Sequence, residues 1–145
     1  WDYGARGTML GLTRGSGRPQ ITRAVLEGVA HRGADLVEAA EAGTGYTVPL
    51  LRVDGGMSQN PTFVQALANA SGKPVEVSRH TEATTIGAAY LAGLAVGVWG
   101  SIDDIADLWK PSQVVAPAAT LDRAQWAEAV ERSRRWIPDL SALDF

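Results

Sequence analysis

The sequence predicts an α/β fold. Short runs rich in Val, Leu and Thr alternate with longer amphipathic runs of helical periodicity, and glycines separate the two kinds of run. The expected strands lie at residues 8–13, 50–54 and 74–78, and the expected helices at 20–42, 60–71 and 81–97. Such alternation is typical of α/β layers with crossover connections, in which ligands bind beyond the carboxyl ends of the strands.

The composition is that of an ordinary globular domain. The chain has 145 residues, 46% of them hydrophobic, which is enough for the core of one domain or of part of one. The formal net charge of −3 gives no electrostatic reason to expect nucleic acid or a membrane surface as a partner. The absence of cysteine excludes disulfides and thiolate metal sites, and it fits a reducing compartment.

The hydrophobic pattern predicts neither a membrane span nor a secretory leader. The longest apolar stretch, residues 86–99, is too short to cross a bilayer. No positively charged segment followed by an apolar one opens the chain. The chain starts at Trp1 instead of a methionine, which we interpret as a fragment or a processed chain.

The candidate site lies in residues 50–71, LLRVDGGMSQNPTFVQALANAS, which have the pattern of strand, glycine turn and helix. Gly55 and Gly56 lack a Cβ atom, so the backbone can adopt positive φ angles and a ligand can approach it closely. Asn60 is a favourable N-cap, and Pro61 then occupies the first helical position. A helix N-terminus behind a glycine loop offers free N–H groups to an anionic ligand. Two interpretations stay open, a nucleotide site and an ordinary tight turn.

The helices outside this stretch carry further expectations. His31 has no metal-ligand partner nearby in the sequence, which indicates a packing or surface residue. Gly43 and Gly72 are the expected helix stops. The helix at 81–97, with Thr81 as its expected cap, has glycine and alanine along one side. Because a helical glycine costs about 1 kcal/mol relative to alanine, this smooth side indicates close packing against another element.

The last third of the chain is predicted to be a mainly helical tail. Its expected elements are two helices and one strand, at residues 101–109, 121–136 and 113–116. Ser101 is the expected cap of the first helix. A basic cluster is expected on a solvated face, formed by Arg132, Arg134 and Arg135. Residues 138–145 are expected to be loose.

Several motifs, in one order along the chain, resemble those of the glycerol kinases. They are the opening WDYGARGTMLGLTRG, the turn from Leu51 to Gly56 with Asn60 behind it, and the GAAYLAGLAVG helix from Gly87. A second signature pattern of that family fits residues 7–27. The resemblance covers residues 1–99 and is weaker beyond Ser101.

The resemblance implies a fold and a role for the central stretch. Glycerol kinases belong to a wider family of sugar and polyol kinases with an actin-like, ribonuclease H-like ATPase fold, which implies a mixed sheet flanked by helices. Residues 1–145 would be part of the C-terminal nucleotide-binding domain, with 101–145 as a helical tail. The backbone of Gly55 and Gly56 would lie beside the adenosine part of ATP, with Asn60 at the adenine. Asn60 would cap its helix, face the base, or exchange between these roles.

The resemblance also implies the activity of the parent enzyme and what this chain leaves out. The parent would phosphorylate glycerol with ATP and Mg²⁺, in the cytoplasm and as a homo-oligomer, giving glycerol 3-phosphate and ADP. In the family, the aspartate base, the phosphate loop, the Mg²⁺ ligands and the polyol pocket all precede the matched segment. We therefore expect no catalytic residue and no metal ligand in this chain, and no turnover by it alone. Asp54 would belong to a strand end, not to the base motif.

The same resemblance makes residues 8–13 the third strand of an antiparallel meander and places the helix from Thr81 near the cleft. The tail beyond Ser101 would be peripheral to catalysis.

Three alternative functions stay open: another polyol or pentulose kinase such as a xylulose kinase-like enzyme, a non-catalytic nucleotide-binding module, and a sugar-independent ATPase of the same fold. The Val-Asp-Gly-Gly turn and the GAAYLAGLAVG helix favour glycerol.

Overall fold

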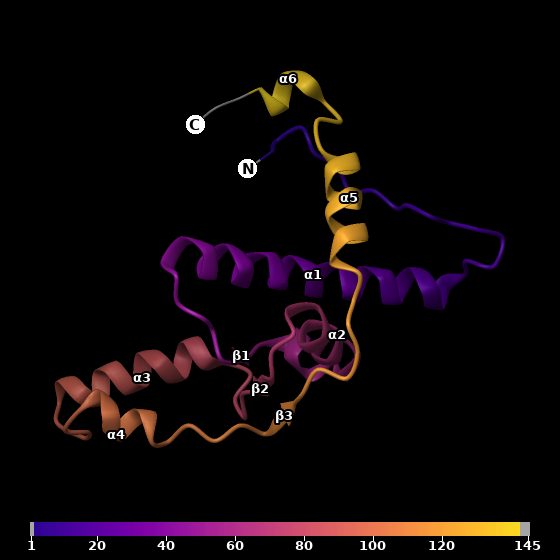
Figure 1. The fold of residues 1–145 in the computed structure, drawn as a ribbon. Helices are drawn as coiled ribbons and strands as arrows, with labels where there is room; N and C mark the ends of the chain where they lie inside the picture. The colour runs from indigo at the N-terminus through magenta and orange to yellow at the C-terminus, as the bar shows by residue number, and fades with distance from the viewer. Residues whose placement is uncertain (1, 143–145) are drawn as a thin grey trace.

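The computed structural model describes residues 2–142, which form a small mixed sheet with helices around it (Figure 1). In chain order, the elements up to the second helix are α1 (Arg18–Thr44), β1 (Leu51–Val53), the 3-10 turn η1 (Gly56–Gln59) and α2 (Pro61–Ser71). The remaining elements are β2 (Val75–Val77), α3 (Ala83–Ala95), α4 (Ile102–Ala106), β3 (Gln113–Val115), α5 (Arg123–Ser133) and α6 (Pro138–Ser141).

The three strands are arranged in the order β1-β2-β3. Strands β1 and β2 are parallel, with Leu51 opposite Val75, and β2 and β3 are antiparallel, with Val75 opposite Val115. The parallel pair is joined through α2, as a crossover connection requires. The expected mixed sheet flanked by helices is therefore confirmed, and the loop before α2 leaves the sheet at the carboxyl end of β1.

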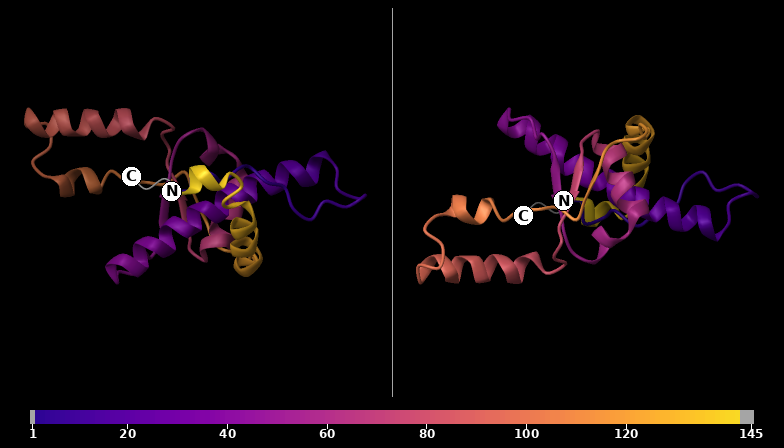
Figure 2. Two further views of the ribbon diagram at one scale, coloured as in Figure 1. Left: turned by 90° about the horizontal axis from the view of Figure 1, so that it is seen from above. Right: turned by 90° about the horizontal axis from the view of Figure 1, so that it is seen from below.

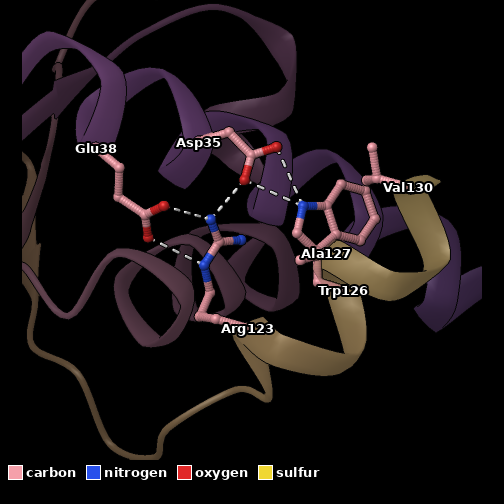
Figure 3. Close-up of a pocket in the computed structure, with 6 residues that line it drawn as sticks. All are labelled: Asp35, Glu38, Arg123, Trp126, Ala127 and Val130. Atoms are coloured by element: carbon pink, nitrogen blue, oxygen red, sulfur yellow. Dashed lines mark hydrogen bonds and ion pairs between the residues drawn. The ribbon is translucent and has the colours of Figure 1, made fainter. Parts of the chain in front are cut away.

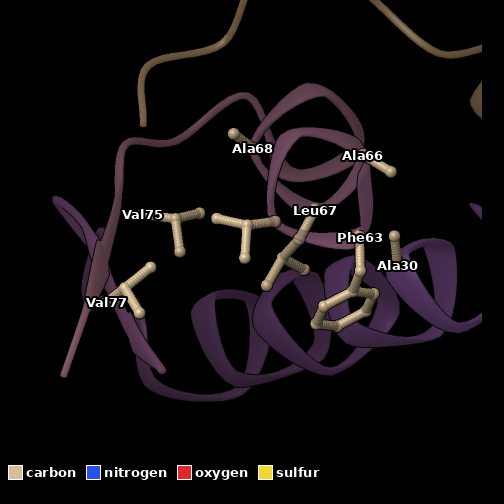
Figure 4. Packing of buried hydrophobic residues seen from close by; sticks show 8 residues of the cluster. Ala30, Phe63, Ala66, Leu67, Ala68, Val75 and Val77 are labelled. Atoms are coloured by element: carbon tan, nitrogen blue, oxygen red, sulfur yellow. The ribbon is translucent and has the colours of Figure 1, made fainter. Parts of the chain in front are cut away.

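The core lies where α2 packs against both α1 and the sheet (Figure 4). Val64 and Leu67 of α2 are buried with Val75 of β2 and Ala30 of α1. Gly33 allows the two helices to approach closely, because a Cβ atom there would lie 2.9 Å from Leu67 Cδ1. This packing fixes the start of α2, and with it the loop that precedes α2.

On the outer face of the sheet, Arg52 and Glu76 contact Trp109, which lies in the segment before β3. Glu76 accepts hydrogen bonds from Arg52 Nε at 3.0 Å and from Trp109 Nε1 at 2.6 Å. The Arg52 guanidinium carbon lies 4.7 Å from the centroid of the Trp109 ring, within the range of cation–π attraction. Alternation along β2 therefore separates an apolar inner face from a polar outer face.

The start of the described chain and its last helix are tied together. Asp2 Oδ1 accepts a hydrogen bond from Ser141 Oγ at 2.5 Å, and Asp2 Oδ2 accepts one from the N–H of Arg135 at 3.0 Å. The N–H of Ile137 donates to the carbonyl of Gly4 at 3.0 Å. The prediction that 138–145 are loose is thus wrong for Pro138–Ser141, which form α6; residues 143–145 lie outside the described residues.

The basic cluster of the tail is exposed, as predicted. The side chains of Arg132 and Arg134 keep 63% and 45% of their surface accessible. Arg132 forms an ion pair with Glu128 within α5, and Arg134, directly after α5, forms one with Glu131. Exposed pairs at this spacing contribute little to stability, about 0.3–0.5 kcal/mol each.

The predicted strand at 8–13 is wrong. Within residues 2–142 this segment pairs with no strand, and its large apolar side chains Met9, Leu10 and Leu12 are 63%, 47% and 59% exposed. A strand requires ladder partners for its N–H and C=O groups, and neither the residues around it nor the sheet provides them. The segment instead forms the long indigo loop beside α1 (Figure 1).

Helix α3 differs from the prediction at its start and on its smooth side. It begins at Ala83 with Glu82 at the N-cap and without a side-chain cap, so the predicted Thr81 cap is wrong. Close packing is found at Gly93, where a Cβ atom would lie 2.0 Å from the Trp99 ring, whereas a Cβ atom at Gly87 would meet nothing within 4 Å. Helices α3 and α4 extend away from the sheet (Figures 1 and 2), which leaves most of the smooth side uncovered.

Several predicted helix ends are confirmed. Gly72 ends α2 in the left-handed region at φ 68°, where glycine has no steric cost. Ser101 caps α4 by accepting a hydrogen bond from the N–H of Asp104 at 3.2 Å. The predicted stop at Gly43 is wrong, because α1 continues to Thr44 and has Gly45 as its C-cap at φ 69°.

Candidate functional site

The glycine loop begins directly after β1 and reaches α2 through η1. Gly55 has φ 80° and ψ 179°, a combination that is essentially restricted to glycine. Gly56 then starts the 3-10 turn, which runs to Gln59. The sequence predicted that the two glycines allow positive φ angles in this turn. The structure shows that only Gly55 of the pair has one.

Ser58 is a buried residue of the loop, only 2% exposed, and it hydrogen-bonds to the loop backbone. The carbonyl oxygen of Gly55 accepts two hydrogen bonds from this residue, from the backbone N–H at 3.2 Å and from Oγ at 2.7 Å. Gln59 Nε2 lies 3.4 Å from the same Oγ. Ser58 was not among the predicted site residues, because a serine in a turn gives no signal of burial.

Asn60 is the N-cap of α2, as predicted. Its Oδ1 atom accepts hydrogen bonds from the N–H groups of Thr62 at 3.0 Å and Phe63 at 3.3 Å. Only the oxygen of a carboxamide can accept, so this geometry leaves Nδ2 as the free end of the side chain. Asn60 is exposed, and no described residue accepts a hydrogen bond from Nδ2. Capping and ligand contact are thus compatible, since they use different atoms.

The outer surface of the loop is open. A Cβ atom built on Gly55 or on Gly56 would meet no atom within 4 Å. Among the described residues, the N–H of Gly56 has no hydrogen-bond acceptor, as is usual for the first group of a helical turn. The loop therefore offers bare backbone, an unpaired N–H and a side-chain amide on one short segment, and it brings together all three predicted site residues.

A shallow depression lies beside the start of α2. It has a volume of about 520 Å³ and is lined by Thr62 and by five residues of α1: Arg18, Pro19, Thr22, Arg23 and Leu26. Arg23 is paired with Glu27 at 2.8 Å. No residue from Gly55 to Asn60 and no strand residue lines it, so the depression lies between the starts of α1 and α2.

A second polar cluster lies where α5 crosses α1 (Figure 3). Arg123 Nη2 donates to Asp35 Oδ1 at 2.5 Å and to Glu38 Oε2 at 3.0 Å. Trp126 Nε1 lies 3.1 Å from both carboxylate oxygens of Asp35, and its ring stacks on His31 with a centroid distance of 4.9 Å. His31 is thus a packing residue, as predicted, and the cluster fastens α5 to α1.

The electrostatics of this cluster favour a structural role. Burial and the neighbouring Arg123 guanidinium hold the pKa of His31 below its usual value of 6.5. Burial raises the pKa of Asp35, but the hydrogen bonds from Arg123 and Trp126 outweigh it, so the pKa lies below 3.8. The pocket of about 250 Å³ at this crossing is therefore lined by charges that already have partners. No sequence pattern revealed it, since Asp35 and Arg123 are 88 residues apart.

Residues 2–142 contain neither a membrane-spanning helix nor a cluster of metal-ligating side chains. None of the helices described combines the length and the hydrophobicity that a bilayer span requires. No group of three or more His, Asp or Glu side chains in the same residues is placed to hold a metal ion.

Residues 1–96 match the C-terminal domain of the FGGY family of carbohydrate kinases. Because this match covers most of the chain, the chain belongs to the FGGY carbohydrate kinase family.

Within that family, the curated relatives it matches include glycerol kinases. The chain is 45% identical over 147 residues to the glycerol kinase of Deinococcus radiodurans, an alignment that covers 98% of this chain and 29% of that protein. It is 45% identical over 141 residues to the glycerol kinase of Trichlorobacter lovleyi, covering 94% and 28% of the two chains. The chain therefore spans less than a third of the length of these relatives.

Solved structures of the family have the same fold. The glycerol kinase of Plasmodium falciparum with ADP superposes with a TM-score of 0.76 at 35% identity, covering 89% of this chain and 27% of that one. A ligand-bound xylulose kinase of Lactobacillus acidophilus gives a TM-score of 0.66 at 26% identity, covering 91% and 26%. The predicted actin-like ATPase class is confirmed by these neighbours.

Proposed function

We propose that this chain forms the adenosine-binding side of the nucleotide cleft in a glycerol kinase. The natural full-length protein would transfer the terminal phosphoryl group of ATP to a hydroxyl of glycerol, giving glycerol 3-phosphate and ADP. The observation that carries the proposal is the open loop from Gly55 to Asn60 at the carboxyl end of β1, in a chain 45% identical to a glycerol kinase.

The loop residues have separate roles in this proposal. The peptide between Gly55 and Gly56 lies against the adenosine, where any side chain would occupy the space of the ligand. Asn60 Nδ2 donates a hydrogen bond to a ring nitrogen of the adenine while Oδ1 keeps its bonds to the start of α2. The cap thereby fixes the rotamer that presents Nδ2, which lowers the entropy lost on binding.

The chemical step itself is assigned to other parts of the protein. Bound ATP supplies the phosphoryl group, and in phosphoryl transfer the enzyme contributes mainly positioning and electrostatic stabilisation. Mg²⁺ belongs to this proposal as the usual partner of ATP, and residues 2–142 contain no group of three or more His, Asp or Glu side chains placed to hold it. The proposal further includes a cytoplasmic location and a homo-oligomeric enzyme.

The alternative with specific support is a pentulose kinase, because a xylulose kinase superposes with a TM-score of 0.66. A coupled assay of ADP release by the natural full-length protein, with ATP and Mg²⁺, separates the candidates. We expect turnover that depends on glycerol and not on xylulose. Turnover with xylulose alone would favour the pentulose kinase, and turnover without any polyol would favour an ATPase. Binding of ADP without turnover would indicate a non-catalytic nucleotide-binding module.

A further inference from the structure

Ser58 is a buried polar residue beneath the glycine loop. It is 2% exposed and, with Ser78, makes up the buried polar side chains found in the described part of the chain. A buried hydroxyl is costly unless it is hydrogen-bonded, and Ser58 Oγ meets this requirement by donating to the carbonyl of Gly55 at 2.7 Å. The proposed function gives this serine no role, yet it contacts the backbone that carries the site.

The direction of that hydrogen bond determines what the loop presents to a ligand. The carbonyl of Gly55 and the N–H of Gly56 belong to one planar trans peptide, so they point in opposite directions. Two bonds from Ser58, at 2.7 and 3.2 Å, turn the carbonyl toward the buried side. The N–H of Gly56 therefore points away from Ser58, and no described residue accepts a hydrogen bond from it.

We propose that Ser58 is a positioning residue for the nucleotide: its buried hydroxyl holds the Gly55–Gly56 peptide so that the N–H of Gly56 donates to the adenosine part of the ligand. This inference rests on the proposed function, since it deepens the same site. The flexibility of glycine makes the device necessary, because the Gly55–Gly56 backbone has more accessible conformations than any other pair of residues. A peptide fixed in advance loses less entropy when the ligand binds.

The test compares Ser58→Ala, Ser58→Cys and wild type in the natural full-length protein. Isothermal titration with ADP gives the Kd and the fraction of active molecules separately. We expect Ser58→Ala to raise the Kd for ADP about three- to tenfold, the range expected for one lost hydrogen bond. Ser58→Cys, which keeps the shape and a weaker donor, should lie between wild type and alanine. Kinetics should show a higher KM for ATP with unchanged kcat and unchanged KM for glycerol.

Ser71→Ala is the matched control. Ser71 also donates its hydroxyl to backbone carbonyls, Leu67 at 2.8 Å among them, but it lies at the far end of α2. Its removal should lower the melting temperature and leave the Kd for ADP unchanged. A lower active fraction with an unchanged Kd in Ser58→Ala and in Ser58→Cys would overturn the inference and leave a merely structural serine. If wild type itself bound no ADP, the proposed function would fail first.

Discussion

The Oδ1 atom of Asn60 lies 3.0 Å from the backbone nitrogen of Thr62, so the side chain proposed to contact the base also begins helix α2. The two functions use the two ends of one carboxamide, because the oxygen accepts from the helix and the nitrogen remains free. Substitutions at Asn60 can therefore separate helix capping from ligand contact, which tests whether Asn60 binds the adenine.

Asn60→Asp should keep the helix and lose the ligand. Aspartate is as good an N-cap as asparagine, and its charge interacts favourably with the helix N-terminus, so we expect an unchanged or higher melting temperature. The same change removes the Nδ2 donor and places a carboxylate at the adenine, so binding of ADP should weaken at least tenfold. Asn60→Ala should lose the ligand and also about 1 kcal/mol of stability. Thermal melts and ADP titrations of the two variants measure both effects.

Asp122→Ala is the control for the capping effect alone. Asp122 caps α5 by accepting from the N–H of Gln125 at 2.8 Å, away from the loop. This variant should lose about 1 kcal/mol of stability without any change in ADP binding. Wild-type affinity in Asn60→Asp would show that Nδ2 does not contact the ligand.

The two glycines should respond differently to alanine. Gly55 has φ 80°, so Gly55→Ala should cost about 1–3 kcal/mol of stability. Gly56 is not in the positive-φ region and has free space around it, so Gly56→Ala should be neutral or stabilise the fold by up to about 1 kcal/mol. Gly56→Ala should nevertheless weaken ADP binding, and Gly56→Val should abolish it, because both fill the space of the ligand. Chemical denaturation and ADP titration of the three variants check this pattern; a Gly56→Val protein that still binds ADP would contradict it.

Stability should fall as the pH drops from 7 to 5, partly through His31. Burial and Arg123 lower the pKa of His31 in the folded state, although Asp35, Glu27 and Asp122 oppose the shift. Above about pH 6.5 the histidine is neutral in both states; below it the unfolded chain takes up the proton first, so the free energy of unfolding decreases. Nδ1 of His31 lies 2.9 Å from Arg123 Nη1 and must accept from it, which protonation prevents.

The matched variant for this effect is His31→Phe, which keeps a ring to stack on Trp126 but cannot take up a proton. It should be less stable than wild type at pH 7 and show a smaller loss between pH 7 and pH 5. Urea denaturation at several pH values gives the two slopes. If the free energy of unfolding changed equally with pH in wild type and in His31→Phe, protonation of His31 would not contribute to the pH dependence.

The sequence predicted the conformation of the loop well because its determinants are local. The strand before Gly55, the left-handed glycine and the cap at Asn60 are all specified within ten residues, and each follows from a short-range rule. The same local rules wrongly predicted a strand at 8–13, since strand formation depends on partners distant in sequence. The Arg123–Asp35 contact was missed for the same reason.

Residues 1–145 alone should self-associate. Strand β1 lies at the edge of the sheet, where one row of its N–H and C=O groups has no described partner strand. Helix α1 also exposes an apolar row, with Val25, Val29 and Leu36 at 56%, 42% and 69% exposure. Sedimentation velocity across a concentration range should show oligomers, reduced by Val29→Lys with Leu36→Lys. A monomer at all concentrations would show that these surfaces do not associate.

The central claim, that the loop from Gly55 to Asn60 holds adenosine, is tested most directly by a crystal structure of the natural full-length protein with ADP. The account predicts the adenine within hydrogen-bond distance of Asn60 Nδ2, the peptide between Gly55 and Gly56 against the adenosine, and Oδ1 still bonded to the start of α2. A nucleotide bound elsewhere, or an adenine out of reach of Asn60, would contradict it.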